Sequence, residues 1–157
     1  MECKALKEQK QKKQPTKKQP KISHETSKAT SDTSTDSNTP SAEKVAQYNK
    51  LFAKALKMPR KKKIEMLKQA VAINSAGDKA PAELSLLLME YKKTRHEAEN
   101  FAKLALQANP DNGKAWLALG YIYQLNGNNE QSREAYIKCS KCSGPNMFVR
   151  DCKRILR

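Results

Sequence analysis

The sequence contains little that would support catalysis or a membrane span. Its two histidines, His24 and His96, have no nucleophile at a suggestive spacing, and its five glycines are scattered rather than gathered in a phosphate-binding loop. A helix that spans a bilayer needs a run of about 18 apolar residues, and no such run occurs. We therefore expect neither an enzyme nor an integral membrane protein, and we expect no cofactor.

Cysteine is also sparse, with four residues in a chain of 157. This number is too small for a disulfide framework in a chain of this length. The first residues contain no apolar run that would serve as a secretory signal. Both observations predict an intracellular, reducing location, and we expect the protein to be cytoplasmic.

Three of these cysteines, Cys139, Cys142 and Cys152, lie near the end of the sequence. A structural zinc site needs four ligands, and neither a fourth cysteine nor a histidine lies nearby. We expect no metal site. Cys139 is better interpreted as a small hydrophobic residue of the core.

Aromatic residues make up 6% of the chain, and none precedes Tyr48. Residues 1–42 are rich first in Lys and Gln and then in Ser and Thr. Ordering such a segment would cost about 1–2 kcal/mol per residue, with no apolar burial to offset it. We predict a disordered leader over residues 1–42, basic and then Ser/Thr-rich, and a folded domain over residues 43–157.

Acidic residues are outnumbered by basic ones, 16 against 31, which gives a net charge of +15. The leader contains nine Lys and five acids, so most of the excess lies on the folded part. A fixed positive patch there would attract phosphate, acidic protein or anionic lipid, and the alternative is a solvated helical surface. The densest basic cluster consists of Lys54, Lys57, Arg60, Lys61, Lys62, Lys63 and Lys68.

Apolar residues from Tyr48 onward recur at the spacing of amphipathic helices. Val45, Tyr48, Leu51 and Phe52 mark the first, which Ser41 can cap and which ends at Met58-Pro59. The same pattern predicts further helices up to residue 75, from about 81 to 91, over 96–109, on either side of a turn at 126–129, and over 148–156. A break at Gly144-Pro145 separates the last two helices. The fold class is therefore all-α.

The most specific motif lies in residues 113–146. Trp116, Leu119, Gly120 and Tyr123 have the spacing W-x2-L-G-x2-Y on one helix, followed by a turn at Gly127 and a second helix. This motif resembles the tetratricopeptide repeat (TPR), a helix–turn–helix unit of about 34 residues. The short length and asparagine-rich turns are similar to those of bacterial members.

The 34-residue period divides the folded part into repeats 45–78, 79–112 and 113–146. The second repeat keeps small residues where two helices cross and a closing proline, whereas the first repeat is the most degenerate. The resemblance implies a right-handed α-solenoid of three repeats, and a capping helix over residues 147–157. The residues that carry the repeat pattern are Ala98, Ala105, Pro110, Trp116, Leu119, Gly120, Tyr123, Gly127 and Tyr136.

The resemblance also implies a concave groove lined by the first helix of each repeat. Carried over by position, the groove residues are Asn49, Ala53, Leu56, Glu83, Leu87, Glu90, Leu117, Tyr121 and Gln124. Some family members clamp a terminal carboxylate with Lys, Asn and Arg. Lys114 matches one clamp position, but other clamp positions hold Asn49, Ala53, Leu84 and Ala118, so a clamp of that kind is not expected. A surface with two acids suits a peptide or helix with an apolar anchor and a basic residue.

The sequence therefore predicts a non-catalytic protein–protein interaction module, a scaffold or adaptor that binds a peptide or helix in its groove. The alternative is a basic module that binds nucleic acid or anionic membrane through residues 54–68 and the Lys-rich leader. Base stacking requires exposed aromatics among the charges, and the nearest in sequence, Tyr48 and Phe52, lie on the apolar face.

Overall fold

The structure is a computed structural model that describes residues 41–143 and 147–157. The predicted leader, apart from its last two residues, and the predicted break at Gly144-Pro145 lie outside these residues. The described residues are all-α. Their helices are α1 (Ala42–Leu56), α2 (Arg60–Ile73), α3 (Lys79–Leu88), η1 (Lys92–Thr94, a 3₁₀ turn), α4 (Arg95–Ala108), α5 (Gly113–Leu125), α6 (Asn129–Lys141) and α7 (Met147–Ile155).

Local sequence explains where these helices begin and end. The Ser41 side chain accepts a hydrogen bond from the Lys44 amide at 3.4 Å and caps α1, as predicted. The Asn112 side chain accepts from the Ala115 amide at 3.1 Å and caps α5. The turn after α5 contains Gly127 at φ 80°, a left-handed conformation that glycine adopts without steric cost.

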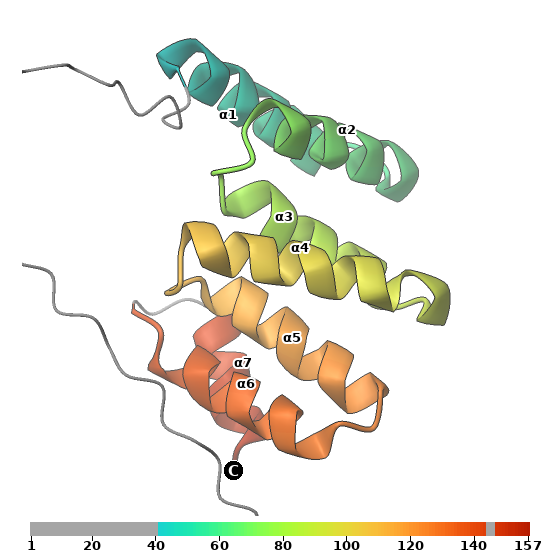
Figure 1. The fold of residues 1–157 in the computed structure, drawn as a ribbon, viewed down its shortest axis with the longest axis vertical. Helices are drawn as coiled ribbons and strands as arrows, with labels where there is room; N and C mark the ends of the chain where they lie inside the picture. The colour runs from blue at the N-terminus through green and yellow to red at the C-terminus, as the bar shows by residue number, and fades with distance from the viewer. Residues whose placement is uncertain (1–40, 144–146) are drawn as a thin grey trace, which may run out of the picture. The chain divides into compact units, whose positions relative to one another are not determined.

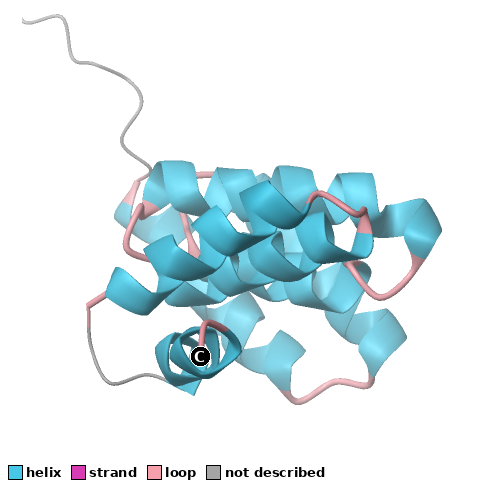
Figure 2. Cartoon of the chain, turned by 90° about the horizontal axis from the view of Figure 1, so that it is seen from below, coloured by secondary structure: helices cyan, strands magenta, loops and turns pink. Residues whose placement is uncertain are grey.

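The helices form three antiparallel pairs that stack in order along the chain, as Figure 1 shows. The pairs are α1 with α2, α3 with α4, and α5 with α6. Helix α7 packs on α6 and α5, and Figure 2 shows it nearly end-on, at a large angle to the other helices. The predicted α-solenoid of three repeats with a C-terminal capping helix is confirmed.

Small residues allow the helices to approach closely. Ala98, Ala102 and Ala105 on α4 are fully buried. A Cβ built on Gly120 of α5 would lie 2.3 Å from Cε1 of Tyr136 on α6, so any other residue would force the ring or the helices to move. The Ser132 hydroxyl also donates to the Gly120 carbonyl at 2.8 Å, which joins the same two helices at the same point.

One disulfide corrects the expectation that the cysteines are thiols. Cys139 on α6 and Cys152 on α7 are both fully buried and bonded to each other. Cys139 is thus a core residue, as predicted, but as half of a cystine that holds the cap. Spacing alone did not distinguish a pair of core thiols from a cross-link between two helices.

Two negative findings apply to the part of the chain that the structure describes. None of its helices has both the length and the apolar character needed to cross a membrane. Within the same residues, no three His, Cys, Asp or Glu side chains are grouped so that they could hold a metal ion.

Candidate partner-binding site

The first helices of the pairs, α1, α3 and α5, together with α7, carry one face of the stack, which we name the first-helix face. A cavity of about 450 Å³ opens on it. Apolar side chains from three elements line the cavity, Phe52 and Leu56 from α1, Ala82 from α3 and Phe148 from α7. The polar part of its lining comes from residues 78–79 and from the loop that leads into α5.

The nine predicted groove residues differ in their exposure and contacts. Leu56 is 43% exposed and is the one of the nine that lines this cavity. Asn49 and Ala53 are exposed on α1, and Leu87 is half-buried on α3. On α5, Gln124 is exposed and accepts a hydrogen bond from the Tyr136 hydroxyl at 2.9 Å. Tyr121 is half-buried, and its ring meets the Tyr136 ring edge-on with centroids 5.8 Å apart.

Leu117, a predicted groove residue, is buried in the structure. Its side chain is 4% exposed and belongs to the hydrophobic cluster that joins α5, α6 and α7. The physical reason is the cap, because α7 packs on α5 and covers this position. Phe148 of α7, which sequence reasoning did not assign to the groove, lines the cavity instead.

Both predicted groove acids already have basic partners. Glu83 Oε2 lies 2.6 Å from Lys114 Nζ, and both side chains are largely buried, at 17% and 23% exposure. Glu90 Oε2 lies 2.7 Å from Arg60 Nη1. Lys114 Nζ also lies 4.9 Å from the centroid of the Phe148 ring. A basic residue on a partner would therefore have to displace an ion pair, which weakens the predicted preference for such a residue.

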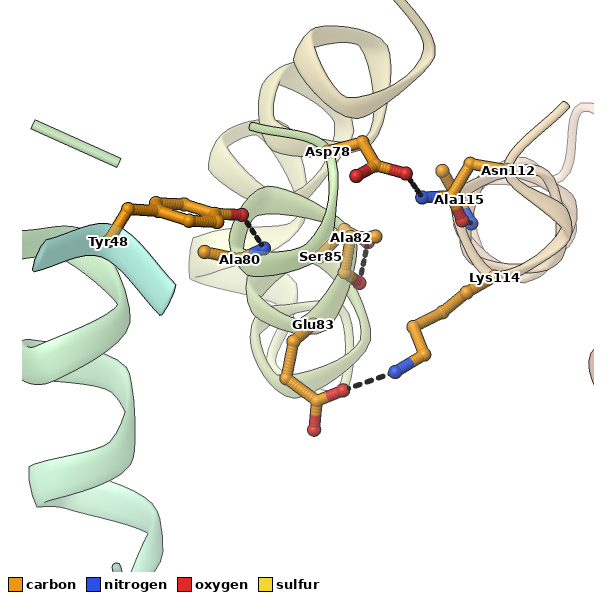
Figure 3. A network of polar contacts seen from close by, with 9 residues as sticks. All are labelled: Tyr48, Asp78, Ala80, Ala82, Glu83, Ser85, Asn112, Lys114 and Ala115. Atoms are coloured by element: carbon orange, nitrogen blue, oxygen red, sulfur yellow. Dashed lines mark hydrogen bonds and ion pairs between the residues drawn. The ribbon is translucent and has the colours of Figure 1, made fainter. Parts of the chain in front are cut away.

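Polar contacts fix the loops beside the cavity, as Figure 3 shows. The Tyr48 hydroxyl accepts from the Ala80 amide at 2.7 Å, and burial raises the pKa of this phenol. Asp78 Oδ2 accepts from the side-chain amides of Asn109 and Asn112, each at 2.9 Å. Because Asn112 also caps α5, one carboxylate holds the starts of α3 and α5 in register.

The carboxylate clamp found in some family members has no counterpart on this face. Two of the clamp positions, those of Leu84 and Ala118, are fully buried, and the other two hold the exposed Asn49 and Ala53. Lys114, which matches a clamp lysine, is paired with Glu83. The structure thus gives a physical reason for the departure that the sequence indicated.

The predicted basic cluster surrounds the turn between α1 and α2. Arg60 is tied to α3 through Glu90, and its guanidinium also donates to the Leu87 carbonyl. Lys68 Nζ lies 2.6 Å from Glu97 Oε1. The cluster members that are exposed and have no ion-pair partner among the described residues are Lys54, Lys57, Lys61 and Lys62.

A second cavity, of about 460 Å³, lies between α4 and α6 and is floored by α5. Trp116 and Tyr123, which the sequence analysis named as residues of the repeat pattern, are half-buried and line it together with the buried Leu119. The Trp116 indole donates to the Pro110 carbonyl at 2.8 Å, and Lys138 Nζ lies 4.9 Å from the centroid of its ring. Both motif aromatics thus have a solvent-facing side.

Comparisons with known proteins agree with this architecture. The family model described as tetratricopeptide repeat matches residues 101–134, which run from α4 through α5 into α6. A TPR domain of OM64 from Arabidopsis is similar in structure, with a TM-score of 0.62 at 14% identity over 73% of this chain and 97% of that one. The Sgt2 TPR domain from Aspergillus fumigatus has a TM-score of 0.54 at 23% identity, over 76% and 83%. No curated protein sequence matches.

The matched repeat and the shared fold show that the described residues form a tetratricopeptide-repeat domain. Such domains generally mediate protein–protein interactions. The two similar structures come from a plant and a fungus, so they give no support to the resemblance to bacterial members.

Proposed function

We propose that this protein is a non-catalytic scaffold or adaptor that binds a peptide or helix of another protein on its first-helix face. The observation that carries this proposal is the cavity lined by Phe52, Leu56 and Phe148. These side chains come from opposite ends of the domain sequence, and none of them is fully buried. An apolar side chain placed among them would remove apolar surface from water on both partners.

The acidic side chains of the first-helix face are already engaged within the domain. Glu83 and Glu90 are engaged by Lys114 and Arg60, and Asp78 accepts two side-chain amide bonds. The apolar anchor therefore supplies the main favourable term, and polar groups of the ligand set its orientation. A short amphipathic helix or extended peptide with one large apolar side chain fits this description.

The test uses peptides selected from a random library against the full-length protein. Leu56→Arg combined with Phe148→Glu should weaken binding of the selected peptide at least tenfold, because both changes place a charge in the apolar cavity. The matched control is Leu125→Arg, since Leu125 is similarly exposed, at 48%, but lies at the other end of α5 from the cavity.

Leu87→Arg with Tyr121→Glu provides a second arm along the same face. If both groove variants bind the peptide as tightly as the unchanged protein, the first-helix face is not the site. Calorimetric titration gives the dissociation constants, and circular dichroism confirms that each variant is folded.

A further inference from the structure

The turns that join the helices of the first two pairs lie together, and we name the surface that they form the turn edge. It comprises residues 54–63 around the α1–α2 turn and residues 89–94 around the α3–α4 turn. Arg60 connects the two, because its guanidinium is paired with Glu90 and donates to the Leu87 carbonyl. The sequence identified the basic residues of the first turn, but it did not indicate that the second turn lies beside them.

The turn edge carries a strong and unneutralised positive charge. Its one acid, Glu90, is engaged by Arg60. The exposed lysines of the turn edge that have no acidic partner among the described residues are Lys54, Lys57, Lys61, Lys62, Lys92 and Lys93. Six cations around two neighbouring turns form a site for a polyanion rather than for a single carboxylate.

Helix stability does not account for this cluster. Four consecutive cations, residues 60–63, occupy the first turn of α2, and that turn contains no acid. The N-terminal end of a helix carries partial positive charge, so cations there are unfavourable. An anionic ligand would relieve both the mutual repulsion of the lysines and their repulsion by the helix end.

No exposed aromatic residue is close in sequence to the basic cluster, but the structure places Tyr91 beside it. Tyr91 is 60% exposed, the largest exposure among the large hydrophobic side chains of the described residues. The Arg60 guanidinium carbon lies 5.3 Å from the centroid of its ring. Because Glu90 and the Leu87 carbonyl hold that guanidinium, the tyrosine ring stands beside a fixed cation in the middle of the lysines.

We propose that the turn edge binds single-stranded nucleic acid, with the six lysines on the phosphates and one base stacked on Tyr91. A stacking platform flanked by cations is how proteins bind single strands without sequence preference. A duplex keeps its bases stacked internally and offers none to Tyr91. Lysines alone attract an anionic membrane, but firm binding is helped by apolar side chains that insert. On these two turns, Tyr91 is the one strongly exposed large hydrophobic side chain that does not line the first-helix cavity.

The test measures fluorescence anisotropy of a labelled 20-nucleotide oligouridine with the full-length protein over a salt series. Tyr91→Ala should weaken binding about fivefold to hundredfold, the range that loss of one stacked base gives, whereas Tyr91→Phe should stay within about twofold. Changing Lys61, Lys62, Lys92 and Lys93 to Gln should reduce the slope of log affinity against log salt by about 3, since each phosphate contact on a single strand contributes about 0.7.

The matched control changes four exposed basic residues near the end of the described chain to Gln: Lys141 of α6, Arg150 and Lys153 of α7, and Arg157 after α7. It removes the same charge far along the chain and should leave the salt slope within about 1 of the original. Equal loss in both quadruple variants would show that net charge, including the Lys-rich leader, accounts for binding, and would overturn the proposal. Unchanged binding by Tyr91→Ala would overturn it as well.

Three other ligands test whether the turn edge prefers a nucleic-acid duplex, an anionic membrane or an acidic polypeptide to a single strand. A 20-base-pair duplex, vesicles with 30% phosphatidylserine, and polyglutamate are titrated under the same conditions. Tighter binding to the oligouridine than to any of them supports the proposal, and tighter binding to one of them overturns it. The first-helix face plays no part in this test, so its failure leaves the peptide-binding proposal unaffected.

Discussion

Gly120 shows how one residue sets the approach of two helices. A methyl group at this position would overlap the Tyr136 ring at 2.3 Å, and Ser132 donates to the Gly120 carbonyl on the same side. The glycine of the sequence motif is therefore required by contact with the next helix rather than by backbone conformation. A Cβ built on Gly77 would likewise lie 2.5 Å from Cζ of Tyr48.

Gly120→Ala should lower the free energy of unfolding by about 1–3 kcal/mol, because α5 and α6 must separate or Tyr136 must leave its position. Urea denaturation of the variant measures this loss. In the double variant with Tyr136→Ala, the Gly120→Ala change should cost much less, since the clashing ring is gone. Additive losses would show that the ring does not cause the effect.

Burial raises the pKa of Tyr136 to about 12, against about 10 in the unfolded chain. Below pH 10 the phenol is protonated in both states, so this residue gives no pH dependence. Between pH 10 and 12 the unfolded chain releases the proton first, and stability falls as pH rises, by about 1.4 kcal/mol at pH 11. Urea denaturation at pH 9 and pH 11 should show a smaller drop for Tyr136→Phe, and equal drops would contradict the assignment.

Among the helices, α7 has the largest effect on the partner-binding site. It supplies Phe148 to the cavity, covers Leu117, and is bonded to α6 through Cys139 and Cys152. Asp111 in the α4–α5 loop also accepts two bonds from the Ser143 amide, at 2.8 and 3.1 Å, and these bonds hold the pKa of the carboxyl below its usual value. The chain leaving α6 is thus anchored before it reaches the cap.

Replacing both Cys139 and Cys152 with Ala should lower the free energy of unfolding by about 3 kcal/mol, because a cross-link spanning 13 residues restricts the unfolded chain. Thermal denaturation without reductant measures the loss, and a reducing agent should lower the unfolding temperature of the unchanged protein but not of the variant. Cys142→Ala is the control, since Cys142 is the free thiol of the described residues. A variant as stable as the original would show that the cystine does not secure the cap.

Local rules predicted most of the elements, but not all of their limits. Ser41 caps α1 and Pro59 precedes α2 as the sequence indicated. Helix α3 begins at Lys79 rather than near Pro81, because a proline in the first turn of a helix lacks an amide that would have no partner there. The turn at residues 92–95 contains a 3₁₀ helix, and α4 begins at Arg95.

At the scale of the whole molecule, the repeat period predicted the stacking, while the surfaces depend on contacts between repeats that the period does not specify. The sequence motif correctly placed Trp116, Gly120 and Tyr123 on one helix. The motif did not indicate that Glu83 forms an ion pair with Lys114, or that the Arg60 guanidinium packs on the ring of Tyr91 in the next repeat. Such pairs form between side chains about 30 residues apart in sequence, where position within a repeat fixes the backbone but not the partner.

Two cavities of similar volume lie on different faces of the stack. We assign partner binding to the one lined by Phe52, Leu56 and Phe148 rather than to the one lined by Trp116 and Tyr123. Amide chemical-shift mapping of the full-length protein with a library-selected peptide distinguishes them directly. We predict that the shift changes centre on residues 52–56, 78–82 and 148 and leave residues 103–107 and 131–138 unmoved. Changes centred on the second set would contradict the account.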